Sequence, residues 1–236
     1  MAEVGIPTAQ GTMPGYLARP AGAGPAPGVL VLFEAFGSTP EMRAHADRLA
    51  AAGYLALVPD LYFWGAKVRC FMATLVATRR RSGRAIDDIE AARAWLAASE
   101  ECTGKVGIVG FCMGGSLALA CAPGGGYAAA APNYGEVPSD AERVLEGICP
   151  VVASFGSRDR YLRGHADRLR TALEALGVPH DVKEYEGATH GFMNPHPNLA
   201  AKLNALFLPL HYDPAAADDA WARILTFFDD HVRSSP

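Results

Sequence analysis

The sequence predicts an α/β fold, with a mostly parallel central sheet flanked by helices on both faces, in a single domain. Short apolar runs bounded by glycine and proline alternate with longer segments of helical periodicity, which is the pattern of strands buried between helices. The 236 residues are 50% hydrophobic and 19% charged, a composition and length that suit one globular domain.

The expected elements follow in order along the chain. Residues 1–27 should form an N-terminal strand or hairpin and a turn-rich connection rather than a separate domain. Buried strands are expected at residues 28–33, 54–59, 105–110, 128–133, 150–156 and 180–186. Helices are expected at residues 39–53, 87–98, 116–122, 165–176 and 218–232. The first helix has defined ends, because Thr39 can cap it, Pro40 suits its first turn and Gly53 can end it.

Charge and composition argue against several classes of partner. The formal net charge is −4 and the isoelectric point is near 6.0, so no strong positive field attracts nucleic acid or anionic lipid. We read no secretory signal at the start, and no apolar run approaches the roughly 18 residues of a membrane span. The five cysteines lack the spacing of a zinc site or a disulfide scaffold. We therefore expect a cytoplasmic protein, monomeric or a small homo-oligomer, with no metal, no membrane and no nucleic-acid partner.

Residues 105–120 read KVGIVGFCMGGSLALA, an apolar strand that runs through a glycine-rich turn into a helix of small residues. Cys112 lies between Gly110 and Gly114, the spacing of a nucleophile elbow, where a Cβ atom would collide as the chain reverses. A thiol at the start of a helix is favoured as the reactive thiolate. The short pattern also fits a buried structural cysteine, so by itself it leaves both interpretations open.

Partners for a cysteine nucleophile follow two other predicted strands. Asp159 comes shortly after strand 150–156, and His190 lies in a glycine-flanked loop after strand 180–186. The carboxyl ends of parallel strands meet at one edge of a sheet, where ligands bind. The order nucleophile, acid, histidine is that of the α/β-hydrolases.

Two further carboxylates end predicted strands. Asp60 precedes the elbow in sequence, so we expect it to hydrogen-bond within its own turn. Glu34 follows strand 28–33, at the place where hydrolases of this architecture supply an oxyanion-hole amide. Glu34 is therefore either a functional group facing the thiol or a loop carboxylate paired with an arginine.

Three further histidines and a cluster of arginines are expected to have no functional role. His45, His165 and His231 fall within predicted helices and are expected at the surface. The arginines at 79–81, with Arg84, form a basic run that is expected to be a solvated surface patch.

Five motifs together resemble the dienelactone hydrolase family of α/β-hydrolases. They are EAFG at 34–37, PDLY at 59–62, GKVGIVGFCMGG at 104–115, GSRDRY at 156–161 and GATHGF at 187–192. The resemblance implies that Cys112 attacks a lactone or ester carbonyl, that His190 shuttles the proton and that Asp159 orients the histidine. It also implies an oxyanion hole made by the backbone N–H groups of Met113 and Ala35.

The resemblance further implies that Glu34 pairs with the resting thiol and becomes the base that ionises it when substrate arrives. Family members that act on dienelactone hold its carboxylate with two arginines. Asn194 stands in the place of one, and Arg69 is the nearest cationic candidate for the other. This departure indicates a different or less anionic substrate. Phe36 and Tyr134 match pocket positions loosely.

The prediction is a cysteine-dependent hydrolase whose partner is a small-molecule lactone or activated ester, with no cofactor. One alternative is a catalytically idle hydrolase fold that serves as a binding protein. Another is a class I glutamine amidotransferase, which shares the cysteine turn, but Ser116 and the tripeptide at 190–192 replace that family's glutamine and His-x-Glu pair. The mixed segment 192–217 is either a loop that covers the pocket or a surface excursion.

Overall fold

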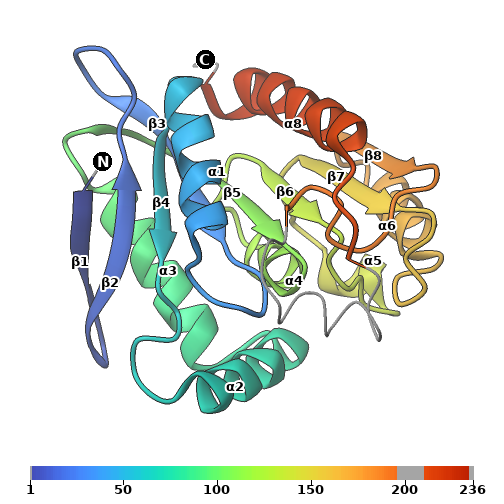
Figure 1. The fold of residues 1–236 in the computed structure, drawn as a ribbon, viewed down its shortest axis with the longest axis horizontal. Coiled ribbons are helices and arrows are strands. Elements are labelled where there is room, and N and C mark those ends of the chain that lie inside the picture. The colour runs from blue at the N-terminus through green and yellow to red at the C-terminus, as the bar shows by residue number, and fades with distance from the viewer. Residues whose placement is uncertain (1, 196–209, 234–236) are drawn as a thin grey trace.

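The computed structural model describes residues 2–195 and 210–233, which contain one eight-stranded sheet in the order β1-β2-β4-β3-β5-β6-β7-β8 (Figure 1). The strands are β1 Ala2–Thr8, β2 Gly11–Ala18, β3 Ala26–Leu32, β4 Leu55–Pro59, β5 Cys102–Phe111, β6 Ala130–Asn133, β7 Val151–Gly156 and β8 His180–Tyr185. The β1–β2 and β2–β4 pairs are antiparallel, and every pair from β4 to β8 is parallel. The predicted α/β class with a mostly parallel sheet is confirmed.

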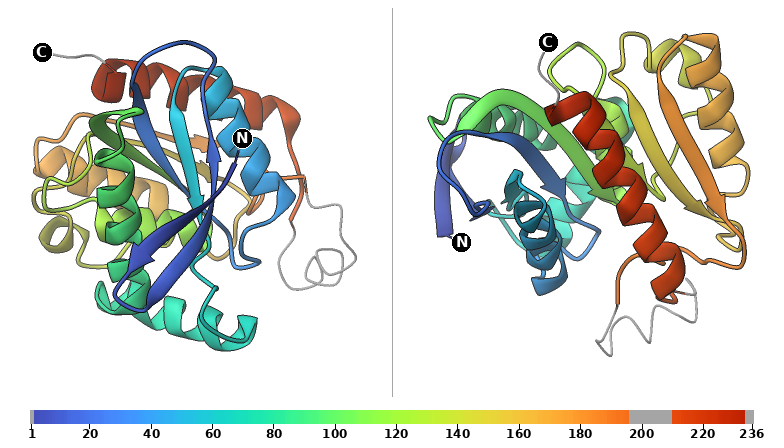
Figure 2. Two further views of the ribbon diagram at one scale, coloured as in Figure 1. Left: turned by 90° about the vertical axis from the view of Figure 1, so that its left-hand side faces the viewer. Right: turned by 90° about the horizontal axis from the view of Figure 1, so that it is seen from above.

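Helices cover both faces of this sheet. They are α1 Pro40–Ala51, α2 Lys67–Arg80, α3 Arg84–Ala97, α4 Met113–Cys121, α5 Ala141–Val144, α6 His165–Ala175 and α8 Pro214–Phe228, followed by the π-helical turn η1 Asp229–Arg233. Helices α1 and α8 lie on one face, and α3, α4 and α6 lie on the other (Figures 1 and 2). Within the described residues, none of these helices combines the length and the hydropathy that crossing a bilayer requires.

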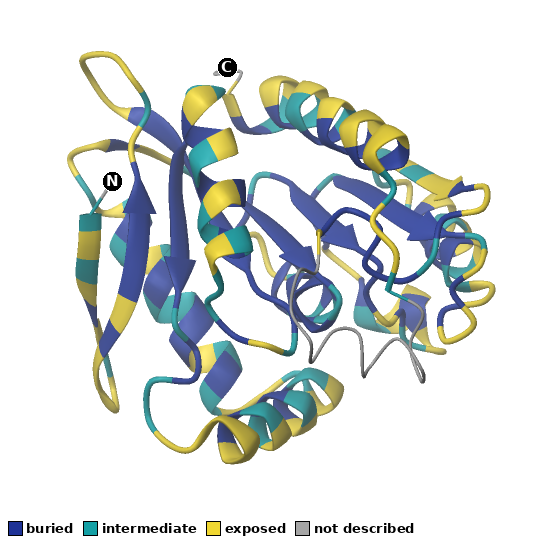
Figure 3. Cartoon of the chain, in the orientation of Figure 1, coloured by how far each residue is buried: buried dark blue, intermediate teal, exposed yellow. Residues whose placement is uncertain are grey.

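Strands β3, β4, β6 and β7 are buried along their whole length because helices cover both faces of the sheet, whereas the edge strands β1 and β8 are largely exposed or half-buried. The helices expose their outer faces (Figure 3). All of β3 is buried, which explains why its sequence is an unbroken apolar run rather than an alternating one. Burial on both faces is the reason that strands of this type can be predicted from the sequence.

Helix α2 was not among the predicted elements. It buries the small side chains of Cys70, Thr74 and Ala77, while Val68 and Met72 on its outer side are 76% and 51% exposed. A helix that buries its small residues and exposes its large apolar ones lacks the one-sided apolar stripe by which amphipathic helices are recognised.

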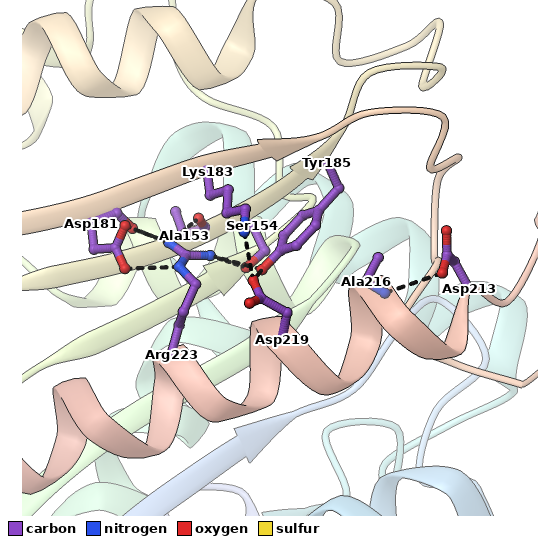
Figure 4. Close-up of polar contacts among 9 residues, drawn as sticks. All are labelled: Ala153, Ser154, Asp181, Lys183, Tyr185, Asp213, Ala216, Asp219 and Arg223. Atoms are coloured by element: carbon purple, nitrogen blue, oxygen red, sulfur yellow. Dashed lines mark hydrogen bonds and ion pairs between the residues drawn. The ribbon is translucent and has the colours of Figure 1, made fainter.

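Helix α8 is tied to the edge of the sheet by polar contacts. Figure 4 shows Arg223 of α8 reaching Asp181 of β8, with Nε 2.8 Å from Oδ2, and the hydroxyl of Tyr185 at 3.1 Å. The N-cap Asp213 accepts a hydrogen bond from the Ala216 N–H, and its own N–H donates to the carbonyl of Phe192 at 3.0 Å. These contacts hold the loop after β8. Residues 196–209 of the predicted covering segment lie outside the described residues.

Candidate active site

Cys112 lies in the tight turn between β5 and α4. Its backbone has φ 54° and ψ −116°, a conformation that a non-glycine residue adopts at a cost of about 1–3 kcal/mol. A Cβ at Gly110 would overlap the Gly114 carbonyl, and one at Gly114 would overlap the Leu32 carbonyl of β3. The glycines therefore allow the helix to approach the strand end, and the Cys112 side chain stays partly exposed.

His190 and Asp159 form a buried pair next to this cysteine. His190 Nδ1 donates to Asp159 Oδ2 at 2.6 Å, and the other carboxylate oxygen accepts from the Tyr161 N–H at 3.0 Å. Their loops are joined by the hydrogen bond from the Arg158 N–H to the Ala188 carbonyl at 2.9 Å. Both loops follow strands that pair in parallel, so the fold brings acid and histidine to the same sheet edge.

The electrostatics of His190 link it to Cys112. Burial lowers the pKa of the imidazole, but the charge of a Cys112 thiolate and the hydrogen bonds to Asp159 and Cys112 outweigh burial and raise that pKa to about 10. Once a thiolate forms at Cys112, it therefore stands beside an imidazolium, which is the pairing of an activated cysteine nucleophile.

Glu34 is buried directly beyond the end of β3. Burial raises the pKa of its carboxyl group from 4.5 to about 7, although a hydrogen bond from Asn194 and the charge of His190 act in the opposite direction. The carboxyl group therefore changes its protonation state near neutral pH, where a general base is most effective.

Asn194 connects Glu34 to two further buried side chains. Its Nδ2 donates to the Tyr134 hydroxyl at 3.1 Å, and its Oδ1 lies 2.5 Å from Nε2 of His45 on α1. The Tyr134 ring meets the His190 ring edge-on, with 5.3 Å between centroids. One hydrogen-bonded cluster therefore runs from α1 to the loop that carries His190.

A cavity of about 280 Å³ opens onto Cys112. The residues that line it include Met113, Ala35, Tyr134 and His190. The Met113 N–H is one of the first in α4, where a helix leaves its N–H groups without intrahelical acceptors. Ala35 and Met113 thus both line the cavity beside Cys112. No group of three or more His, Cys, Asp or Glu side chains suited to hold a metal ion occurs within 2–195 and 210–233.

The sequence as a whole matches one family model. The dienelactone hydrolase family model covers residues 13–232. The chain belongs to the dienelactone hydrolase family. The predicted resemblance and the α/β-hydrolase fold are therefore both confirmed, and the chain is a hydrolase-family protein.

Individual relatives agree with the family assignment. The carboxymethylenebutenolidase of Rhodococcus opacus is 28% identical over 234 residues, which cover 92% of this chain and 86% of the relative. A solved structure named m3DLH is 26% identical and superposes with a TM-score of 0.80, covering 98% of both chains. A dienelactone hydrolase-like promiscuous phosphotriesterase from metagenomic libraries, at 24% identity, covers 98% of this chain and 97% of its own with a TM-score of 0.80, and it shows the shared fold.

The predicted substrate-binding residues are not all brought together. Asn194 and Tyr134 are at the site, but Phe36 is 39% exposed. The exposed Arg69 lies over the Trp64 ring, 5.4 Å from its centroid. Neither Arg69 nor Phe36 is among the residues that line the cavity at Cys112.

Two residues expected at the surface contribute to the site. Arg79, near the end of α2, is exposed as expected and also lines the cavity at Cys112 together with Glu136. His45 is buried, stacked 4.5 Å from the Phe111 ring, so its predicted surface position is wrong. The sequence held an indication for His45, because it shares the apolar face of α1 with Met42 and Leu49. For Arg79 no local pattern indicated the cavity.

Proposed function

We propose that the chain hydrolyses lactones or small activated esters through an acyl-enzyme on Cys112. The observation that carries the proposal is the strained cysteine at the mouth of a cavity, with the hydrogen-bonded His190–Asp159 pair beside it. This is the arrangement of nucleophile, base and orienting acid that acyl transfer requires.

In the proposed reaction the Cys112 thiolate attacks the carbonyl carbon, and the N–H groups of Met113 and Ala35 hold the resulting oxyanion. The bond to the leaving oxygen then breaks, and His190, which has received the thiol proton by way of Glu34, gives that proton to the oxygen. His190 next takes a proton from water, whose oxygen attacks the thioester and releases the acid. His190 then returns this proton to the departing thiolate, which restores the resting thiol. With a lactone the leaving oxygen stays attached to the acyl group, so one hydroxy acid is released.

We propose that Glu34 is the base that ionises the resting thiol. Its pKa of about 7 supports this role, because the carboxyl group can take up or release a proton near neutral pH. A thiol held protonated until substrate arrives is less exposed to oxidation. The five free cysteines suit a reducing compartment such as the cytoplasm, which we propose as the location.

The substrate is proposed to be neutral or to carry a single carboxylate. Arg79 lines the cavity beside the acidic Glu136, and the amide of Asn194 occupies the place of the second cation found in dienelactone-binding relatives. One guanidinium binds a carboxylate more weakly than a pair of them. A screen of lactones matched in ring size, with and without a carboxylate, measures this preference.

The decisive experiment replaces Cys112. We expect Cys112→Ala to abolish the hydrolysis of p-nitrophenyl acetate and the acyl adduct seen by mass spectrometry. Cys102→Ser, at a buried cysteine outside the cavity lining, is the matched control and keeps both. Unchanged turnover in Cys112→Ala refutes the mechanism. A wild-type protein that shows no acyl adduct and no rapid iodoacetamide labelling at Cys112 is instead an idle fold used for binding.

A further inference from the structure

The buried cluster around Asn194 contains a residue to which the reaction assigns no step. His45 of α1 contacts the amide oxygen of Asn194 at 2.5 Å. The amide nitrogen of Asn194 hydrogen-bonds to the Tyr134 hydroxyl at 3.1 Å and also to Glu34. Each of these four residues is less than 9% exposed. Each hydrogen bond in the cluster therefore offsets part of the free-energy cost of removing these polar groups from water.

The two ends of the Asn194 amide have the same shape but opposite hydrogen-bonding character. In the observed orientation the oxygen faces His45, and the two N–H bonds serve Tyr134 and Glu34. In the reverse orientation the amide oxygen would face the Glu34 carboxylate, and two acceptors would oppose each other without a proton between them. A donor on the far side of the amide therefore decides which end reaches Glu34.

His45 supplies that donor. Burial lowers the pKa of its imidazole to about 4, with the hydrogen bond to Asn194 and the charges of Arg48 and Glu41 as smaller influences. His45 is therefore neutral at neutral pH, with one N–H, and it adds no positive charge to the cluster. The ring is fixed in place between Phe111, 4.5 Å away by centroids, and Trp221, 5.0 Å away.

We propose that His45 is a positioning residue that donates to Asn194 Oδ1 and thereby fixes the amide with its N–H group directed at Glu34. The inference rests on the proposed function only in that Glu34 is taken as the base. It adds a residue on a different helix that controls this base through an amide. The charged groups that act on Glu34 are His190 and Glu41, and Glu34 in turn acts on the Tyr134 hydroxyl.

Two substitutions distinguish the hydrogen bond that His45 donates from the packing of its ring. His45→Gln keeps an N–H near the position of Nε2 and loses the stacked ring, whereas His45→Phe keeps the ring and loses the donor. The carboxyl titration of Glu34 is followed by ¹³C NMR, with Glu34→Gln used to assign the resonance. Because a hydrogen bond to a carboxylate stabilises the ionised form, we expect His45→Phe to raise the Glu34 midpoint by about one pH unit and His45→Gln to leave it within about 0.3 of the wild-type value.

Asn194→Leu provides a second variant should His45→Phe fail to fold. It removes the amide itself, so it should raise the Glu34 midpoint at least as much as His45→Phe. In the double variant His45→Phe/Asn194→Leu, we expect no rise beyond that of Asn194→Leu alone, because His45 acts only through the amide. Thermal unfolding of every variant checks that the fold persists at the titration temperature.

Two outcomes overturn the proposal. If the Glu34 midpoint shifts in His45→Gln but not in His45→Phe, His45 acts through packing. If the Glu34 midpoint is unchanged in both His45→Phe and Asn194→Leu, the amide has no influence on Glu34. The titration needs no turnover, so it is independent of whether Cys112 carries the reaction. Where the proposed function also holds, the acidic side of the pH profile of kcat/KM shifts with the Glu34 midpoint. A shift of one pH unit lowers kcat/KM about tenfold at a fixed pH on that side.

Discussion

Replacing Glu34 by glutamine should stabilise the protein at alkaline pH and not at acid pH. The carboxyl group is buried, and its pKa rises from 4.5 to about 7 on folding. A group whose folded-state pKa is raised binds its proton more tightly in the folded chain, so its contribution to stability is complete below about pH 4.5 and is lost as the pH rises through about 7. The difference amounts to roughly 3 kcal/mol, at 1.36 kcal/mol per pKa unit.

Glutamine has a similar shape and no proton to lose. We therefore expect the free energy of unfolding of Glu34→Gln, relative to wild type, to increase by roughly 3 kcal/mol between about pH 4.5 and about pH 8.5, which is a stabilisation of the variant. The same substitution should lower kcat/KM, because the proposed base is gone. A substitution that removes a buried charge from an active site is expected to increase stability and to reduce activity.

Urea unfolding of both proteins across this pH range measures the effect. Glu146→Gln, at an exposed position, is the matched control for replacing a glutamate by glutamine. A difference between Glu34→Gln and wild type that is the same at both ends of the range refutes the reasoning, since it means that Glu34 is ionised as easily in the folded chain as in the unfolded one.

Three other substitutions test separate parts of the structure. Asp159→Asn should lower kcat/KM by about 10³–10⁴ and lower the pKa of His190, read from the pH dependence of Cys112 alkylation; a loss under about tenfold contradicts the orienting role. Arg79→Gln should raise KM for lactones that carry a carboxylate and leave KM unchanged for neutral esters, and an equal effect on both argues against Arg79 as the carboxylate contact. Arg223→Met should cost about 1–3 kcal/mol in urea unfolding, because it removes the guanidinium that donates to the buried Ser154 hydroxyl and Ala153 carbonyl of β7; a cost under about 1 kcal/mol shows that α8 is held by its apolar face alone.

Much of the fold was predictable because its central strands are buried on both faces. The fully buried β3 appears in the sequence as an uninterrupted apolar run. Helix α1 begins at Pro40 as expected, because its boundary depends on local residues. Helix α8 begins at Pro214 rather than at residue 218, since its first turn is rich in alanine and shows little periodicity.

The elbow was predictable for a related reason. The glycines at 110 and 114 are required by collisions within a short stretch of chain and its adjacent strand, so their spacing identifies the turn directly. The order of Cys112, Asp159 and His190 along the chain then indicated one sheet edge, because parallel strands end on the same side.

The amino-acid sequence by itself determined the sheet, the turn at Cys112 and the family, because each depends on neighbouring residues or on a repeated pattern. Only the tertiary structure decided which side chains surround Glu34 and which cation reaches the cavity. His45 and Asn194 are 149 positions apart, and Arg79 belongs to a helix whose periodicity is masked by exposed apolar residues. Contacts of this kind arise from how helices pack on the sheet, and no local pattern encodes that packing.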